Sequence, residues 1–299
     1  MAKFLKVFII LLGLAFLSYL LTAYNQPESK PDQFFFGAKN LFEDDSKIKQ
    51  ERASKINSVI DSRLPAEGKY AVYIKDLKSG ETFERNAQEL FGSASIYKLG
   101  VMYKTYDALK KGNLQQNTVL SGSQQGLDST LNPNNKNAFD NTISESVDEA
   151  LRLMITISDN YSALLLAEKF GWANIEDYLK NQGIENFLLA TEPKATAAST
   201  AQILEKIYKG QAVSREASNE MRKLLLSQTV NDRIPKYLPQ NTKVAHKTGE
   251  LDGIRNDAGI VYGKRGDYIF VFFSDTENPQ VSSEKIATLA RDIYNELEQ

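Results

Sequence analysis

Apolar and polar residues alternate at both ends of the chain, as expected for β-strands. The first two candidates, Tyr70 to Asp76 and Glu81 to Arg85, flank the turn-type sequence Lys78-Ser79-Gly80 and predict a hairpin. From Lys243 onward the strand pattern returns in VAHKTG, NDAGIVYG and GDYIFVFFSD. A closing helix is predicted by apolar residues at helical spacing, namely Ile286, Leu289, Ile293 and Leu297.

Between residues 95 and 230 the apolar spacing is mainly helical. The stretch Tyr161 to Phe170 is apolar on nearly every side before Gly171 stops it, so this helix belongs in the middle of a lobe. Strands at both ends with helices between them predict an α+β fold. We expect one antiparallel sheet built from N- and C-terminal strands and flanked by helices, with an all-helical lobe inserted into it. A cleft is expected where the sheet and the lobe meet.

The N-terminal residues have the composition of a membrane segment. Lys3 and Lys6 precede a run without charge from Val7 to Pro27, long enough to span a bilayer. The positive flank predicts a cytoplasmic N-terminus, with the rest of the chain outside and anchored to the cytoplasmic membrane. A signal peptide cleaved after Ala23 is the alternative, and the protein would then be exported. We therefore divide the chain into an anchor or signal peptide (1–24), a linker (25–44) and a globular domain (45–299).

The composition of the chain excludes several classes of protein and of site. The formal net charge is −2, with basic residues spread along the chain, so no basic surface for nucleic acid is expected. The absence of cysteine excludes thiol nucleophiles, thiolate metal sites and disulfides, and one histidine leaves little from which to build a zinc centre. We expect no metal and no cofactor, and a monomer.

Ser95 and Lys98 are the strongest candidates for chemistry. They lie three residues apart at the start of a predicted helix, a spacing that puts both side chains on one face. The positive end of the helix dipole favours a developing alkoxide and disfavours the protonated form of Lys98. A neutral Lys98 could then accept the proton of Ser95.

Three motifs occur in order: Ser95-Ile96-Tyr97-Lys98, Ser158-Asp159-Asn160 and Lys247-Thr248-Gly249. Residues 45–299 resemble the penicillin-recognising serine hydrolases, and among them the class A β-lactamase family. The resemblance rests on these three motifs and on longer segments such as MITISDNYSALLLAEKFG and VAHKTGELDGIRNDAGIVY. The resemblance implies a β-lactamase/transpeptidase-like fold and an acyl-serine mechanism.

The resemblance also implies a role for each motif residue. Ser95 would be the acylated nucleophile, Lys98 its base, Ser158 the proton relay to the leaving nitrogen, and Asn160 a hydrogen-bond partner of the substrate amide. The alternative for Ser158-Asp159-Asn160 is a polar cap of the following helix, and Asp159 is expected to serve in that way.

The third motif would complete the site. Lys247 would face Ser158 and add positive potential, Thr248 and Arg255 would bind the substrate carboxylate, and the N–H groups of Ser95 and Glu250 would form the oxyanion hole. Because side chains alternate along a strand, His246 points away from Lys247 and is expected to be a packed histidine.

Glu192-Pro193 matches the family's deacylating glutamate and the proline after it, but Thr196 stands where asparagine is expected. The loop is also short, because Ser199-Thr200 already begins the next helix. Glu192 is therefore either the base that activates the deacylating water or a solvated loop acid.

Three functions are compatible with these residues. The leading prediction is a serine hydrolase of the class A β-lactamase type. The alternatives are a D-alanyl-D-alanine carboxypeptidase or related peptidoglycan hydrolase, and a penicillin-binding domain acylated without turnover. In each case the partner is a small-molecule β-lactam or a D-Ala-D-Ala peptide.

Overall fold

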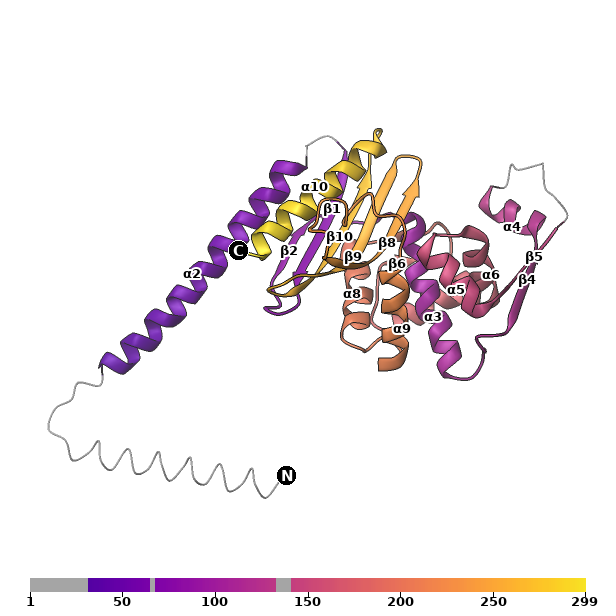
Figure 1. The fold of residues 1–299 in the computed structure, drawn as a ribbon, viewed down its shortest axis with the longest axis horizontal. Helices are drawn as coiled ribbons and strands as arrows, with labels where there is room; N and C mark the ends of the chain where they lie inside the picture. The colour runs from indigo at the N-terminus through magenta and orange to yellow at the C-terminus, as the bar shows by residue number, and fades with distance from the viewer. Residues whose placement is uncertain (1–31, 65–67, 133–140) are drawn as a thin grey trace, which may run out of the picture. The chain divides into compact units, whose positions relative to one another are not determined.

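The computed structural model describes residues 32–64, 68–132 and 141–299, with side chains from residue 47 onward. A five-stranded sheet lies at its centre, in the order β2-β1-β10-β9-β8 (Figure 1). Its strands are β1 (Lys69–Asp76), β2 (Thr82–Arg85), β8 (Lys243–Leu251), β9 (Ile254–Tyr262) and β10 (Asp267–Asp275). All neighbours are antiparallel, and β1 pairs with β10, so strands from both ends of the domain meet. This arrangement confirms the predicted α+β class.

Both faces of the sheet are covered, because β10 is buried along almost its whole length. On one face, Val72 and Phe272 belong to the same buried cluster as Leu289, which lies on α10 (Pro279–Leu297). The second half of α2 (Asp32–Arg63) contributes Ile56 and Ile60 to this cluster. The other face packs against α8 (Ala197–Tyr208) and the helical lobe.

The lobe is built mainly from helices, which are α3 (Lys98–Lys110), α4 (Gln124–Leu131), α5 (Val147–Thr156), α6 (Asn160–Phe170), α7 (Trp172–Asn181) and α9 (Arg215–Leu226). The helix predicted to be apolar all round is α6, and Ala163 to Ala167 are buried in succession. It ends at Gly171, whose φ of 82° is a left-handed value that suits glycine. Both predictions about this segment are confirmed.

The lobe is not wholly helical, and on this point the prediction was wrong. A hairpin of β4 (Val119–Ser123) and β5 (Thr142–Ser146) belongs to it. The hairpin is mostly polar, with the hydroxyls of Ser121 and Ser144 2.8 Å apart across the strands. Because these strands lack a regular apolar face, alternation gave no signal for them. The short strands β3 (Phe91–Gly92), β6 (Phe187–Leu188) and β7 (Lys194–Ala195) form a further small sheet.

The described part of the N-terminal segment is helical. Residues 32–44 of the predicted linker belong to α2, which begins at Asp32 and continues without an internal proline to Arg63. The predicted anchor, residues 1–24, lies outside the described residues. Among those that are described, no helix is both long and apolar enough to cross a membrane.

Candidate active site

The predicted nucleophile lies on a segment held from two sides. Ser95 belongs to a single 3₁₀ turn, η1 (Ala94–Tyr97), which leads directly into α3. The N–H of Ser93 donates to the carbonyl of Pro193 at 2.9 Å, and the side-chain amide of Asn256 on β9 donates to the carbonyls of Gly92 at 2.9 Å and Ser93 at 3.2 Å. The loop before α8 and the central sheet together fix the position of Ser95.

The 3₁₀ turn explains how Ser95 and Lys98 share one face. In such a turn, side chains three residues apart are eclipsed, so Lys98 lies one turn beyond Ser95 on the same side. The residue before the serine, Ala94, has a φ of 46°, which is uncommon for a residue other than glycine. Backbone strain of this kind is concentrated at functional sites.

Lys98 is fully buried and contacts the second motif. Its Nζ donates to the carbonyl of Ser158 at 2.6 Å, to Oδ1 of Asn160 at 2.7 Å and to the Ser158 hydroxyl at 3.2 Å. Burial lowers the pKa of Lys98 to about 7, while the nearby Asp159 carboxylate acts in the opposite direction. A neutral amine, the form that can accept a proton, is therefore well populated near neutral pH.

The Ser158 hydroxyl lies between two lysines. Lys247 Nζ donates to it at 2.9 Å, opposite Lys98, and also donates to the carbonyl of Thr248 at 2.8 Å. Ser158 itself has a φ of 61°, in the turn between α5 and α6. Asp159 caps α6 by accepting from the N–H of Ser162 at 2.8 Å, which confirms its predicted structural role. The cap fixes the turn that presents Ser158.

The other buried lysine, Lys247, also loses its charge easily. Burial holds the pKa of Lys247 well below its usual value, and the positive charge of Lys98 adds to this effect. The Asp257 carboxylate acts the other way. Two amines on either side of one hydroxyl can therefore pass a proton through Ser158.

The third motif lies on β8, the edge strand of the sheet, beside the nucleophile. A Cβ on Gly249 would stand 2.8 Å from the Ser93 carbonyl oxygen, so the backbones of β8 and η1 are as close as a glycine permits. The next residue, Glu250, pairs with Arg255 across the β8–β9 register. Thr248, Glu250 and Arg255, the residues expected to bind the substrate, therefore lie together on the β8–β9 hairpin.

Similarity to known proteins identifies the family of this chain. The β-lactamase enzyme family matches residues 51–297, which is most of the chain. The chain belongs to the β-lactamase enzyme family. A β-lactamase of Bacteroides uniformis is 25% identical over 275 residues, covering 83% of this chain and 93% of the relative. The extended-spectrum β-lactamase PER-1 of Pseudomonas aeruginosa is 28% identical over 235 residues, covering 70% and 76%.

Solved structures show the same fold. The TLA-1 extended-spectrum β-lactamase superposes with a TM-score of 0.73 at 21% identity, over 83% of this chain and 99% of that one. PBP-A gives a TM-score of 0.72 at 22% identity, over 83% and 96%. Together with the family match, these findings confirm the prediction of a serine hydrolase of the class A β-lactamase type.

In this member of the β-lactamase family, Glu192 lies in solvent and pairs with a neighbouring lysine. Its side chain is 74% exposed and forms an ion pair with Lys194 at 2.8 Å. The loop that carries it has only five residues between β6 and β7, and Thr196 after it caps α8, accepting from the N–H of Ser199 at 3.0 Å. The predicted start of the next helix is confirmed.

His246 is packed, as expected. It is buried on the side of β8 away from Lys247, with Nδ1 2.9 Å from Oδ1 of Asp257 and Nε2 3.1 Å from Oδ1 of Asn231. It has no contact with Ser95 that would make it a base.

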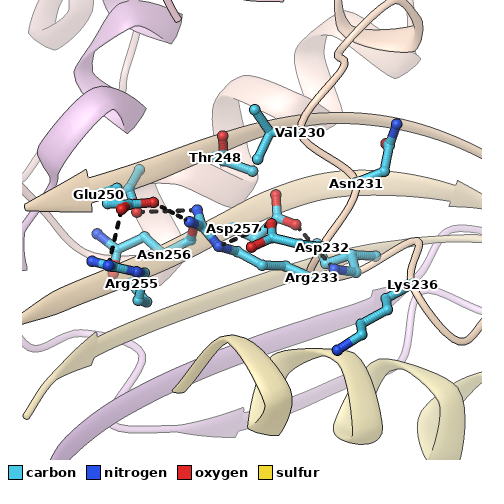
Figure 2. A network of polar contacts seen from close by, with 12 residues as sticks. Val230, Asn231, Asp232, Arg233, Lys236, Thr248, Glu250, Arg255, Asn256 and Asp257 are labelled. Carbon is cyan, nitrogen blue, oxygen red and sulfur yellow. Dashed lines mark hydrogen bonds and ion pairs between the residues drawn. The ribbon is translucent and has the colours of Figure 1, made fainter. Parts of the chain in front are cut away.

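Two residues near the site were not singled out from the sequence. Arg233, from the phrase NDRIPKYLP, is 1% exposed and donates to the Glu250 carboxylate at 2.6 Å (Figure 2). Asn256 holds the nucleophile segment, as described above. An arginine and an asparagine in polar surroundings carry no signal in one sequence, because their burial depends on which strands become neighbours.

Proposed function

We propose that this protein opens β-lactam amides through an acyl-serine intermediate on Ser95 and then hydrolyses the ester. The observation that carries the proposal is the Ser158 hydroxyl held between Lys98 and Lys247, with Lys98 one turn beyond the nucleophile. Neutral Lys98 takes the proton of the Ser95 hydroxyl as the oxygen attacks the lactam carbonyl carbon. The N–H groups of Ser95 and Glu250 are proposed to stabilise the oxyanion.

The leaving nitrogen then needs a proton. As the carbon–nitrogen bond breaks, Ser158 gives its hydroxyl proton to that nitrogen and takes another from the Lys98 ammonium, so the proton removed from Ser95 ends on the product. Asn160, which already contacts Lys98, is proposed to bind the amide of the substrate, and water finally attacks the ester carbonyl and releases Ser95.

A second candidate is a D-alanyl-D-alanine carboxypeptidase or another peptidoglycan hydrolase with the same nucleophile. The exposed Glu192 favours it, because a side chain that points into solvent gives little help in activating a deacylating water. In that case a penicilloyl ester would persist on Ser95, and in the limit the domain would be acylated without turnover.

The proposed setting is the outer side of the cytoplasmic membrane, with the chain as a monomer. Support comes from the sequence alone, in which Lys3 and Lys6 precede the uncharged residues 7–27. A small soluble β-lactam and a cell-wall peptide are both available there. Protease accessibility in intact cells would test the orientation.

The central test is turnover of a chromogenic cephalosporin by the purified full-length chain, with intact-mass measurement of Ser95 acylation. We expect sustained hydrolysis by the wild type and none by Ser95→Ala. Absence of both turnover and a covalent adduct would refute the proposal. An adduct without turnover, together with release of D-alanine from a muropeptide, would establish the second candidate.

A further inference from the structure

The carboxylate of Glu250 is held by two arginines at the rim of the site. Its Oε2 lies 2.6 Å from an Nη of Arg233, and its Oε1 lies 2.9 Å from an Nη of Arg255. Figure 2 shows the Glu250 side chain between the two guanidinium groups, with Thr248 on the same strand. The Glu250 carboxylate therefore pairs with both arginines, one through each oxygen, as a bound carboxylate ligand would.

The other terminal nitrogens of the arginines are also engaged. The second Nη of Arg233 donates to the carbonyls of Gly249 at 3.3 Å and Asn256 at 3.0 Å. The second Nη of Arg255 donates to the carbonyls of Leu251 at 3.0 Å and Ile254 at 2.8 Å. A substrate carboxylate could bind here only by displacing Glu250.

Both arginines already have carboxylate partners within the protein. Asp232 lies 3.5 Å from Arg233 Nε, so the two guanidinium groups are matched by two carboxylates. Arg233 is 1% exposed, whereas the Glu250 side chain is 57% exposed. An approaching substrate therefore meets the carboxylate first and the buried cation behind it.

Glu250 also lies on the same strand as Thr248, which is expected to bind the substrate. It follows Gly249, where an added Cβ would stand 2.8 Å from the Ser93 carbonyl oxygen, and its side chain points to the same face of β8 as that of Thr248. Any group attached to the scissile nitrogen and lying along Thr248 is brought beside the Glu250 carboxylate. If that group is an anion, two like charges approach each other at the site.

We propose that Glu250 determines the charge of the substrate that this site accepts. It takes the place of a substrate carboxylate on Arg233 and Arg255. Lactams and amides with a carboxylate next to the scissile nitrogen therefore acylate Ser95 more slowly than those without one. This inference rests on the proposed acylation of Ser95 and names the substrate class of that same site.

The test compares benzylpenicillin with its methyl ester, which differ only in that carboxylate. The rate constant for acylation of Ser95 is measured by intact mass on the full-length chain, and the acid-to-ester ratio is the readout. Glu250→Gln keeps an acceptor oxygen but loses the charge, and we expect it to raise this ratio about tenfold. Added salt is expected to raise the ratio for the wild type and to have little effect on Glu250→Gln.

Asp252→Asn is the matched control. Asp252 is exposed on the turn between β8 and β9, so this change removes the same charge from the same hairpin without touching the arginine pair described above. We expect the ratio to change less than about twofold. Thermal unfolding of each variant is measured in parallel, and Glu250→Ala provides a second side chain without charge.

The outcomes distinguish a failure of the role assigned to Glu250 from a failure of Ser95 acylation. If Ser95 is acylated but the ratio stays constant or falls in Glu250→Gln, Glu250 is only a counterion of Arg233 and the inference is overturned while acylation stands. If neither compound acylates Ser95 in any variant, the proposed function fails and the inference fails with it.

Discussion

The chemistry of single residues in this protein depends on how far Lys98 has lost its charge. Three acceptors surround its Nζ and suit an ammonium, yet burial brings the pKa to about 7. Only the neutral amine can accept the Ser95 proton, and its fraction falls tenfold for each pH unit below the pKa. We therefore predict that the acylation rate constant rises with pH up to about 7 and then levels off, as measured by rapid quench and intact mass. A flat profile from about pH 5 to 8 would exclude Lys98 as the base.

Asp159 provides the control for that profile. Its charge raises the pKa of Lys98, while its oxygen caps α6. Asparagine is an equally good helix cap but carries no charge. Asp159→Asn should therefore keep the fold and shift the midpoint of the pH profile to lower pH, whereas a shift to higher pH would contradict the assigned electrostatics.

Glu192, unlike Lys98, is not expected to act as a base. With 74% of its side chain exposed and Lys194 as its partner, it lacks the enclosed position that a base for deacylation needs. We expect Glu192→Gln to change the deacylation rate less than about threefold, and deacylation to be slower than acylation, giving a burst in the first turnover. Accumulation of acyl-enzyme through a roughly hundredfold slower deacylation in this variant would instead identify Glu192 as the base.

At the scale of elements, the site depends on how closely β8 approaches the turn that carries Ser95. A methyl group on Gly249 would meet the Ser93 carbonyl oxygen at 2.8 Å and the Ala94 Cβ at 3.3 Å, and neither atom belongs to a flexible side chain. We predict that Gly249→Ala lowers the acylation rate at least about tenfold and destabilises the fold by about 1–3 kcal/mol. Urea unfolding and Ser95 labelling measure the two effects.

Gly266 offers a matched control for this substitution. A methyl group there would meet the Lys78 side chain at 3.5 Å and an Asp76 carboxylate oxygen at 4.0 Å, both ordinary contact distances. Gly266→Ala should therefore leave labelling of Ser95 unchanged. Equal losses in the two variants would mean that the close approach at Gly249 is not what matters.

Elements with a strong local pattern were predictable, and elements defined by their neighbours were not. The first hairpin and α6 follow from alternation and from a continuous apolar run. The β4–β5 hairpin is polar, so its pairing left no periodic signal. The left-handed backbone of Ala94 and Ser158 is likewise imposed by the surrounding structure, since neither residue type favours it.

The candidate site was likewise predictable only in part. Motif spacing brought Lys98, Ser158 and Lys247 to attention, and the structure places them in contact. The Arg233–Glu250 ion pair depends on a loop that folds back on the edge strand, and spacing along one sequence does not encode such a contact. Glu192 matched a family pattern, but the short loop leaves it in solvent.

At the scale of the whole molecule, the sheet needs the end of α2 as well as α10. Ile56 is 0% exposed and Ile60 2% exposed, and both belong to the cluster on the α10 face of the sheet. Arg52, near the start of this part of α2, forms an ion pair with Asp76 at 2.6 Å. Residues 52–299 form one compact unit, which contains all of these contacts.

A truncation series tests this boundary. A chain beginning at Arg52 should keep its unfolding temperature and its acylation of Ser95, because the contacts that cover the sheet remain. A chain beginning after Leu64 should not fold, because it loses Ile56 and Ile60. Truncating even one buried isoleucine to alanine costs about 2–5 kcal/mol, against a typical total stability of about 5–15 kcal/mol.

Ile60→Ala in the full chain gives a milder test by urea unfolding. Its control is Ile48→Ala, since Ile48 is 60% exposed and should contribute less than about 0.5 kcal/mol. Equal effects of these two substitutions would place the boundary of the folded domain elsewhere.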